Sequence, residues 1–113
     1  KGSKLFELIE HGIDPPSFRD GQFYGVKVTA DLTKPYGSRI TSMTLQNGDA
    51  IEPDTYYSVS TLDFVYTGGD SYNFDGATDV FDTFVPVRDA LAEHIKEVGT
   101  VDHEYDATAY VVD

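Results

Sequence analysis

Hydrophobic residues near the N-terminus follow the spacing of an amphipathic helix. Leu5, Leu8 and Ile9 recur at intervals of three and four residues, with acidic residues between them. Ser3 stands where a side chain can cap the first turn, and Gly12 stands where a helix can end. The pattern predicts a short helix, capped by Ser3, over about the first 11 residues.

Two strands are predicted next, separated by a turn. From Tyr24 to Ala30 apolar and polar residues alternate, which is the period of a half-buried strand with Tyr24 on the buried side. Residues 39–46 predict a second strand. Asn47 and Gly48 follow it, and both tolerate the positive φ of a tight turn. We expect the two strands to pair.

The second half of the chain predicts further strands and one more helix. A third strand is predicted at Tyr56–Leu62, which is rich in β-branched and aromatic residues. A long irregular stretch over 63–82 precedes a helix over 85–98, and a last strand is predicted over 107–112. The predicted fold class is α+β, a mixed or antiparallel sheet with two main helices packed on it.

The composition is that of one folded, acidic domain. Of 113 residues, 40% are hydrophobic, which is enough for one core. Lys and Arg number 8 against 20 Asp and Glu, a formal net charge of −12. That sign excludes a phosphate backbone, and therefore nucleic acid, as a partner. No apolar run reaches the about 20 residues that cross a bilayer, so no membrane span is predicted.

The start of the chain points to a longer parent protein. There is no initiator Met and no signal sequence, and the helical pattern begins at once. We expect residues 1–113 to form a single domain cut from that parent. The chain has no cysteine, which removes disulfides and thiol chemistry. Its acidity is typical of high solubility or of an extracellular setting.

No pattern typical of a catalytic or metal centre is present. His11, His94 and His103 lie in different parts of the chain and have neither HxH nor HxxxH spacing. A histidine near the end of a helix is more often a favourable charge beside the helix dipole than a ligand, and we interpret His11 and His94 in this way. No catalytic residue, metal ligand or cofactor is predicted in this chain.

A calcium loop is a lesser alternative. Asn73, Asp75 and Gly76 fall at positions 3, 5 and 6 of the twelve-residue spacing of calcium loops. The first position holds Ser71 and the last holds Asp82, where that pattern has Asp and a bidentate Glu.

The strongest candidate site is a glycine-rich loop that carries an aromatic residue. Gly68 and Gly69 permit backbone conformations that other residues avoid, and Tyr72 follows them. An aromatic ring on such a loop can stack on a planar ligand, and the carboxylate of Asp75 or Asp79 could accept hydrogen bonds from a ribose. The alternative interpretation is that the aromatic side chains here only cover the edge of the core.

Several short segments match the pattern of a known family, in the same order along the chain. They are KGSKL (1–5), EHG (10–12), DLT (31–33), GSRI (37–40), NGD (47–49), YYSVS (56–60), DF (63–64) and GGDSY (68–72). With these segments, over residues 1–98, the chain resembles the C-terminal domain of the 5'-nucleotidase family. Dispersed matches in one order are more specific than a single glycine-rich loop.

The resemblance implies part of a secreted or periplasmic two-domain enzyme that hydrolyses nucleotides, UDP-sugars or cyclic nucleotides. An N-terminal metallophosphoesterase domain would hold a divalent metal pair and the catalytic His and Asp, none of which matches this chain. The C-terminal domain would recognise the substrate through two aromatics that sandwich the base, an acid on the ribose and arginines on the phosphate. Those arginines precede the matching segments, which implies that the chain is the later part of the domain.

The resemblance also implies roles for individual residues. Tyr72 matches one base-stacking aromatic, with Ser71 in place of the glycine before it. Asp75 or Asp79 is the expected ribose ligand. Arg39 matches a family arginine at the start of a strand, which we interpret as structural.

The second aromatic of the family belongs to a Phe-x-Gln-x-x-Gly pattern. Gln22 and Gly25 match this pattern, whereas Asp20 stands at the Phe position. Phe18 or Phe23 is the expected substitute.

We therefore expect a base- and ribose-recognition domain of a metal-dependent phosphohydrolase, inert alone, located extracellularly, at the cell surface or in the periplasm. Its expected partners are a nucleotide or nucleoside and the N-terminal domain of the same parent chain. The alternative is an acidic extracellular module that keeps the fold of this family but is not part of a catalytic unit and serves in binding or structure. Calcium binding is a lesser option for such a module.

Overall fold

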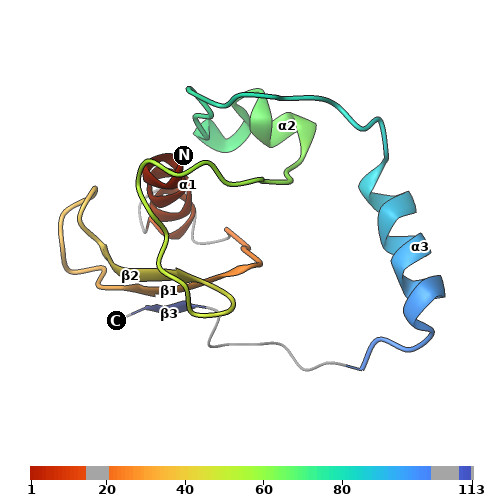
Figure 1. Ribbon diagram of the computed structural model, residues 1–113, viewed down its shortest axis with the longest axis horizontal. Helices are drawn as coiled ribbons and strands as arrows, with labels where there is room; N and C mark the ends of the chain where they lie inside the picture. The colour runs from red at the N-terminus through yellow and green to blue at the C-terminus, as the bar shows by residue number, and fades with distance from the viewer. Residues whose placement is uncertain (15–20, 103–109, 113) are drawn as a thin grey trace.

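The computed structural model has an α+β fold, as the sequence predicts, and describes residues 1–14, 21–102 and 110–112 (Figure 1). Of residues 110–112 only the backbone is described. In chain order the elements are α1 (Gly2–Ile13), β1 (Val26–Ala30), β2 (Ile40–Leu45), α2 (Asp63–Tyr66), the 3-10 turn η1 (Gly69–Ser71), α3 (Val87–Val98) and β3 (Tyr110–Val112).

The strands form a mixed sheet in the order β2-β1-β3. β1 and β2 are antiparallel, with Val28 opposite Met43, and β3 is parallel to β1 on its other side. This confirms the expected pairing of the first two strands. The predicted turn after β2 is also confirmed, because Gly48 has φ +94° and its N–H donates to the carbonyl of Leu45 at 2.9 Å. The predicted last strand is described only from Tyr110, since 107–109 lie outside the described residues.

α1 lies over the sheet and closes the core (Figure 1). Ile9 of α1 packs with Val28 of β1, Met43 of β2 and Ile51, and none of these four is more than 6% exposed. Each such side chain stabilises the fold by about 1.5–3 kcal/mol. Burial alternates along β1 as predicted, because Val28 and Ala30 are buried and the residue between them is exposed.

The free backbone N–H groups in the first turn of α1 are hydrogen-bonded by another segment of the chain, not by the side chain of Ser3. The backbone N–H groups of Gly2 and Ser3 donate to the carbonyls of Thr55 and Pro53, at 2.9 and 3.0 Å. The residue that caps the helix is Lys1, and it forms no side-chain cap. The predicted Ser3 cap is therefore wrong, because tertiary contacts satisfy the free donors of the first turn.

β1 begins at Val26 and not at Tyr24 as predicted. Gly25 has φ +88°, a left-handed conformation that interrupts the alternation of a strand. The side chain of Tyr24 is consequently 96% exposed instead of buried.

The predicted strand at Tyr56–Leu62 is wrong, since these residues belong to no strand of the described structure. Tyr57 packs against the core, and its hydroxyl accepts the backbone N–H of Glu52 at 2.8 Å. Val59 is 53% exposed and Leu62 is 47% exposed. Strand-forming residues need a neighbouring strand, and no described strand pairs with this segment.

α3 is a helix within the predicted range, but it stands apart from the sheet (Figure 1). Among the described elements α1 contacts β2, whereas α3 contacts none. Its apolar stripe, which includes Leu91 at 57% and Ile95 at 41% exposure, faces solvent. Packing on the sheet is thus confirmed for α1 and wrong for α3, because the irregular segment over 77–86 leads from the body of the domain to a helix that contacts no other described element (Figure 1).

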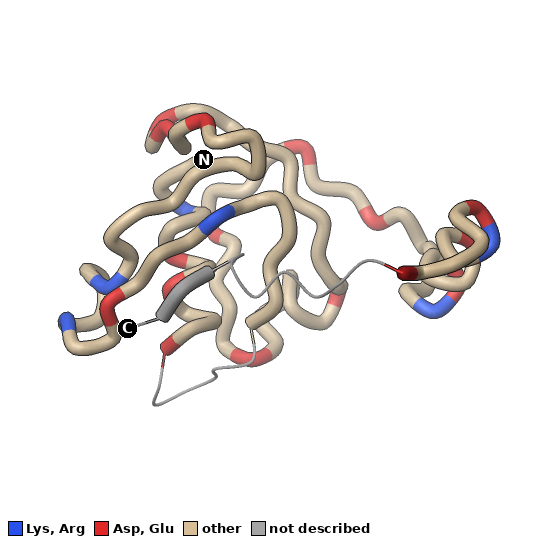
Figure 2. The backbone as a smooth tube through the Cα atoms, turned by 90° about the horizontal axis from the view of Figure 1, so that it is seen from below, with Lys and Arg blue, Asp and Glu red and all other residues tan. Residues whose placement is uncertain are grey.

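Charge is distributed over the whole molecule. Figure 2 shows Asp and Glu around the body of the protein and on α3, which also carries Arg88 and Lys96. Arg39 is paired with Asp14, and both side chains are 13% exposed. The ion pair joins the end of α1 to the start of β2, which agrees with the structural interpretation of Arg39.

Candidate functional site

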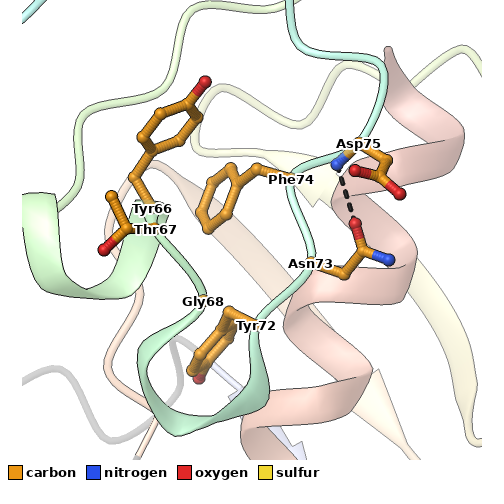
Figure 3. Close-up of a pocket in the computed structure, with 7 residues that line it drawn as sticks. All are labelled: Tyr66, Thr67, Gly68, Tyr72, Asn73, Phe74 and Asp75. Atoms are coloured by element: carbon orange, nitrogen blue, oxygen red, sulfur yellow. Dashed lines mark hydrogen bonds between the residues drawn. The ribbon is translucent and has the colours of Figure 1, made fainter.

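The glycine-rich loop borders an open pocket of about 310 Å³ (Figure 3). That volume is at the lower end of the range of small-molecule sites. One stretch of chain supplies the whole lining, which consists of Tyr66, Thr67, Gly68, Tyr72, Asn73, Phe74 and Asp75.

The stretch is folded back by two short helical turns. Asp63–Tyr66 forms the turn α2, within the long stretch that the sequence predicts as irregular. The Thr67 hydroxyl donates to the carbonyl of Asp63 at 3.0 Å and so ends this turn. Tyr66 consequently lies beside Phe74, with ring centroids 5.5 Å apart and an interplanar angle of 62°. The two rings form an aromatic wall of the pocket (Figure 3).

The two glycines have different physical roles. Gly68 has φ +107°, and no atom lies within 4 Å of the position that a Cβ would take there. Its contribution is the left-handed backbone at the rim of the pocket. At Gly69 a Cβ would overlap the ring of Phe64, so the absence of a side chain allows the backbone to pass close to that ring. Gly69 is not part of the lining.

Tyr72 connects the pocket to the end of α1. Its ring centroid is 4.5 Å from that of His11, with an interplanar angle of 78°. Its hydroxyl oxygen lies 2.6 Å from the position that a Cβ on Gly12 would occupy. The ring is half-buried, so it both lines the pocket and packs on the helix.

Phe23 approaches the same point of α1. Its Cζ lies 2.5 Å from the Cβ position of Gly12, and the Gly21 N–H donates to the carbonyl of Gly12 at 3.1 Å. The structure therefore brings Phe23 and Tyr72 together at Gly12, although Phe23 also packs against the core. Phe18, the other expected substitute, lies outside the described residues, as does Asp20.

The structure separates the two candidate ribose ligands. Asp75 lines the pocket, and its backbone N–H donates to Oδ1 of Asn73 at 2.8 Å (Figure 3). Asp79 is exposed, has φ +53° and is not part of the lining.

The described residues contain no cluster of metal-ligand side chains. Among residues 1–14 and 21–102, no three His, Cys, Asp or Glu side chains converge on a point where a metal ion could be held. In the same part of the chain, no helix is long and apolar enough to cross a bilayer.

Sequence reasoning misses three contributors to this region. The sequence predicts Tyr66 and Thr67 only as part of a long irregular stretch. Their place in the lining depends on the turn α2, which the sequence does not predict. The sequence interpretation of His11 is only that of a charge at a helix end. No local pattern connects His11 to Asp70, because the two residues are 59 positions apart in the sequence. In the structure, Nε2 of His11 lies 2.7 Å from the backbone oxygen of Asp70.

The model of a protein family described as "5'-nucleotidase, C-terminal domain" matches residues 1–76, about two thirds of the chain. The chain belongs to this family. The matched range includes the glycine-rich loop, Tyr72 and Asp75 but not α3. No curated protein sequence matches the chain.

A solved structure shows that the 5'-nucleotidase C-terminal domain fold extends beyond the matched range. The structure described as a 5'-nucleotidase precursor from Thermus thermophilus has a TM-score of 0.86 and 22% sequence identity with this domain. The similarity covers 99% of this chain and 24% of that one. This domain thus spans about a quarter of the protein that it resembles.

Proposed function

We propose that this domain recognises the base and ribose of a nucleotide for a metal-dependent 5'-nucleotidase-type phosphohydrolase and is not catalytic alone. The observation that carries the proposal is one pocket in which Tyr72, Asp75 and Gly68 lie together within the range matched by the family model. Tyr72 would stack on the base, and Asp75 would accept hydrogen bonds from the ribose hydroxyls. Phe23, at the same end of α1, is the second aromatic of the proposed site.

The chemistry of hydrolysis belongs to another part of the polypeptide in this proposal. An N-terminal metallophosphoesterase domain would hold two divalent metals and the groups that activate water. This domain would contribute by positioning, because a fixed base and ribose place the phosphate in a defined orientation.

The exposed face of α3 supports the proposed partner domain. Leu91 and Ile95 present apolar surface that no described element of this chain covers. The resembling protein from Thermus thermophilus has about four times the length of this domain. We propose that the preceding part of the parent polypeptide covers α3.

The proposed location is extracellular, at the cell surface or in the periplasm. The resembling structure is described as a precursor, a word used of proteins that are processed after synthesis. A formal net charge of −12 is compatible with such a setting.

A second candidate function is a non-catalytic binding or structural module. The observation that favours it is the packing of Tyr72 on His11 and Gly12, which gives the ring a role within the fold. The two functions differ in what they predict for nucleosides, since the module would not bind them.

An NMR titration of the 113-residue chain with adenosine, AMP and uridine tests the proposal, with calcium as a control ligand. Saturable amide shifts at Gly68 and Asp75 are expected with the nucleosides. Tyr72→Ala should weaken binding by about 1–3 kcal/mol, the contribution of one stacked base, whereas Tyr72→Phe should retain most of it. The matched control is Tyr24→Ala, because Tyr24 is 96% exposed and lies outside the pocket. Unchanged affinity in Tyr72→Ala would exclude the stacking role.

A further inference from the structure

His11 lies near the end of α1 and contacts the loop that carries Tyr72. Its Nε2 is 2.7 Å from the backbone oxygen of Asp70. Its ring packs edge-to-face on Tyr72 at 4.5 Å. One imidazole therefore contacts two neighbouring parts of the same loop, although it is not itself part of the pocket lining.

The contact with Asp70 defines which nitrogen of His11 carries a proton. A backbone carbonyl can only accept a hydrogen bond, so Nε2 must donate. The neutral tautomer with hydrogen on Nε2 can do this, and so can the imidazolium. The neutral tautomer with hydrogen on Nδ1 alone cannot.

The bonded carbonyl belongs to the peptide between two left-handed residues. Asp70 has φ +54° and Ser71 has φ +62°, directly after Gly68 and Gly69. Residues with a Cβ adopt this conformation rarely, and two in succession need support from outside the loop. The hydrogen bond from His11 acts at the peptide that joins them and therefore favours this backbone conformation over its alternatives.

Tyr72 follows Ser71 directly, so the left-handed pair fixes the direction in which its side chain leaves the backbone. We propose that His11 is a positioning residue of the base-binding pocket. It holds the 68–72 loop through Asp70 and orients the ring of Tyr72 toward a planar ligand. The inference rests on the proposed function and adds to it a residue of α1 that does not touch the ligand.

The test compares adenosine affinity in His11→Leu, His11→Gln and the wild-type chain. Leu removes the donor and keeps an apolar side chain of similar size, whereas Gln restores an N–H donor. His94→Leu is the matched control, because His94 is exposed on α3. We expect His11→Leu to weaken adenosine binding by about two- to tenfold, the range of one net hydrogen bond, with partial rescue in His11→Gln and no change in His94→Leu.

A second measurement needs no substitution. A long-range nitrogen–proton NMR spectrum of the wild-type chain should show the proton on Nε2 of His11, together with NOEs between His11 and the Tyr72 ring. A neutral His11 with its proton on Nδ1 would overturn the inference whether or not the variants fold. Wild-type affinity in His11→Leu, with unchanged Tyr72 ring shifts, would also overturn it while leaving the proposed function intact. Absence of adenosine binding in the wild-type chain would instead reject the proposed function, and the NMR contacts would still report on the positioning of Tyr72.

Discussion

The carboxylate of Glu10 on α1 accepts the backbone N–H of Arg39, with Oε1 2.5 Å from the nitrogen. The same carboxylate accepts the N–H groups of Gly37 at 2.5 Å and Ile40 at 3.1 Å. Glu10 is only 5% exposed, so a single buried carboxylate satisfies three backbone donors at the start of β2. This contact holds the turn between β1 and β2 against α1, the helix that closes the core.

Replacing Glu10 should therefore destabilise the domain. In Glu10→Gln one oxygen becomes an NH₂ group that faces backbone donors, and the expected loss is about 1–3 kcal/mol in the free energy of unfolding. Urea denaturation followed by circular dichroism measures this loss. Glu93→Gln, on the exposed surface of α3, is the matched control and should change stability little. Equal stability of the two variants would contradict the role given to Glu10.

A side chain at Gly12 should disturb the aromatic residues beside the pocket. A Cβ at this position would meet the ends of the Tyr72 and Phe23 rings, at 2.6 and 2.5 Å, so both rings must move in Gly12→Ala. The better helix propensity of Ala, by about 1 kcal/mol, offsets part of the cost of this overpacking. We expect a small change in stability but altered Tyr72 ring shifts and weaker adenosine binding. Ser3→Ala, exposed on the same helix, should change neither, and unaltered Tyr72 shifts in Gly12→Ala would show that the ring does not pack there.

Asp31 provides a prediction about pH. The Thr33 hydroxyl donates to Oδ1 of Asp31 at 2.6 Å, and the Thr33 backbone N–H donates to the same oxygen at 2.9 Å. These two hydrogen bonds, the hydroxyl's first, hold the pKa of Asp31 below its ordinary value. Because the pKa is lower in the folded than in the unfolded chain, Asp31 stabilises the fold above about pH 4, and this contribution is lost as the pH falls through the folded pKa.

Thr33→Val removes the stronger of the two bonds and should raise the pKa of Asp31 toward its ordinary value. The titration of the Asp31 carboxyl carbon by NMR measures the change directly. Thr78→Val, in an exposed part of the irregular segment before α3, should leave the pKa of Asp31 as it is. An Asp31 pKa that stays low in Thr33→Val would contradict the leading role of the hydroxyl and assign the effect to the backbone bond and the charge of Lys34.

The two main helices should respond differently to truncation of an apolar side chain. Ile9 of α1 is 5% exposed in the core, whereas Leu91 of α3 is 57% exposed. Ile9→Ala should cost about 2–5 kcal/mol in the free energy of unfolding, and Leu91→Ala should change it by less than about 0.5 kcal/mol. Denaturant unfolding of both variants in the 113-residue chain tests this. A loss in Leu91→Ala that approaches that of Ile9→Ala would mean that α3 packs on the domain in solution.

Sequence periodicity predicts those elements whose partners are close along the chain. The alternation at Val28 and Ala30 identifies β1, and Asn47 with Gly48 identifies the turn after β2, because both patterns depend on local backbone geometry. The strand predicted at Tyr56–Leu62 is wrong for the opposite reason. Its residue types favour a strand, but strand formation needs a partner that the local sequence does not specify.

The candidate site is predictable in part for the same reason. The glycine pair and Tyr72 are close in sequence, so one loop with an aromatic residue can be recognised from composition. The contact of Tyr72 with His11 depends on how α1 packs against the rest of the chain. Only the tertiary structure could show it, as it also placed Asp75, and not Asp79, in the pocket.

The most direct test of nucleoside recognition is a measurement of intermolecular NOEs between adenosine and the ring of Tyr72 in the 113-residue chain. The proposal predicts NOEs from the base protons to the Tyr72 ring and from the ribose protons to residues beside Asp75. Saturable adenosine binding whose NOEs all arise outside residues 66–75 would contradict it, as would the absence of binding by a folded chain.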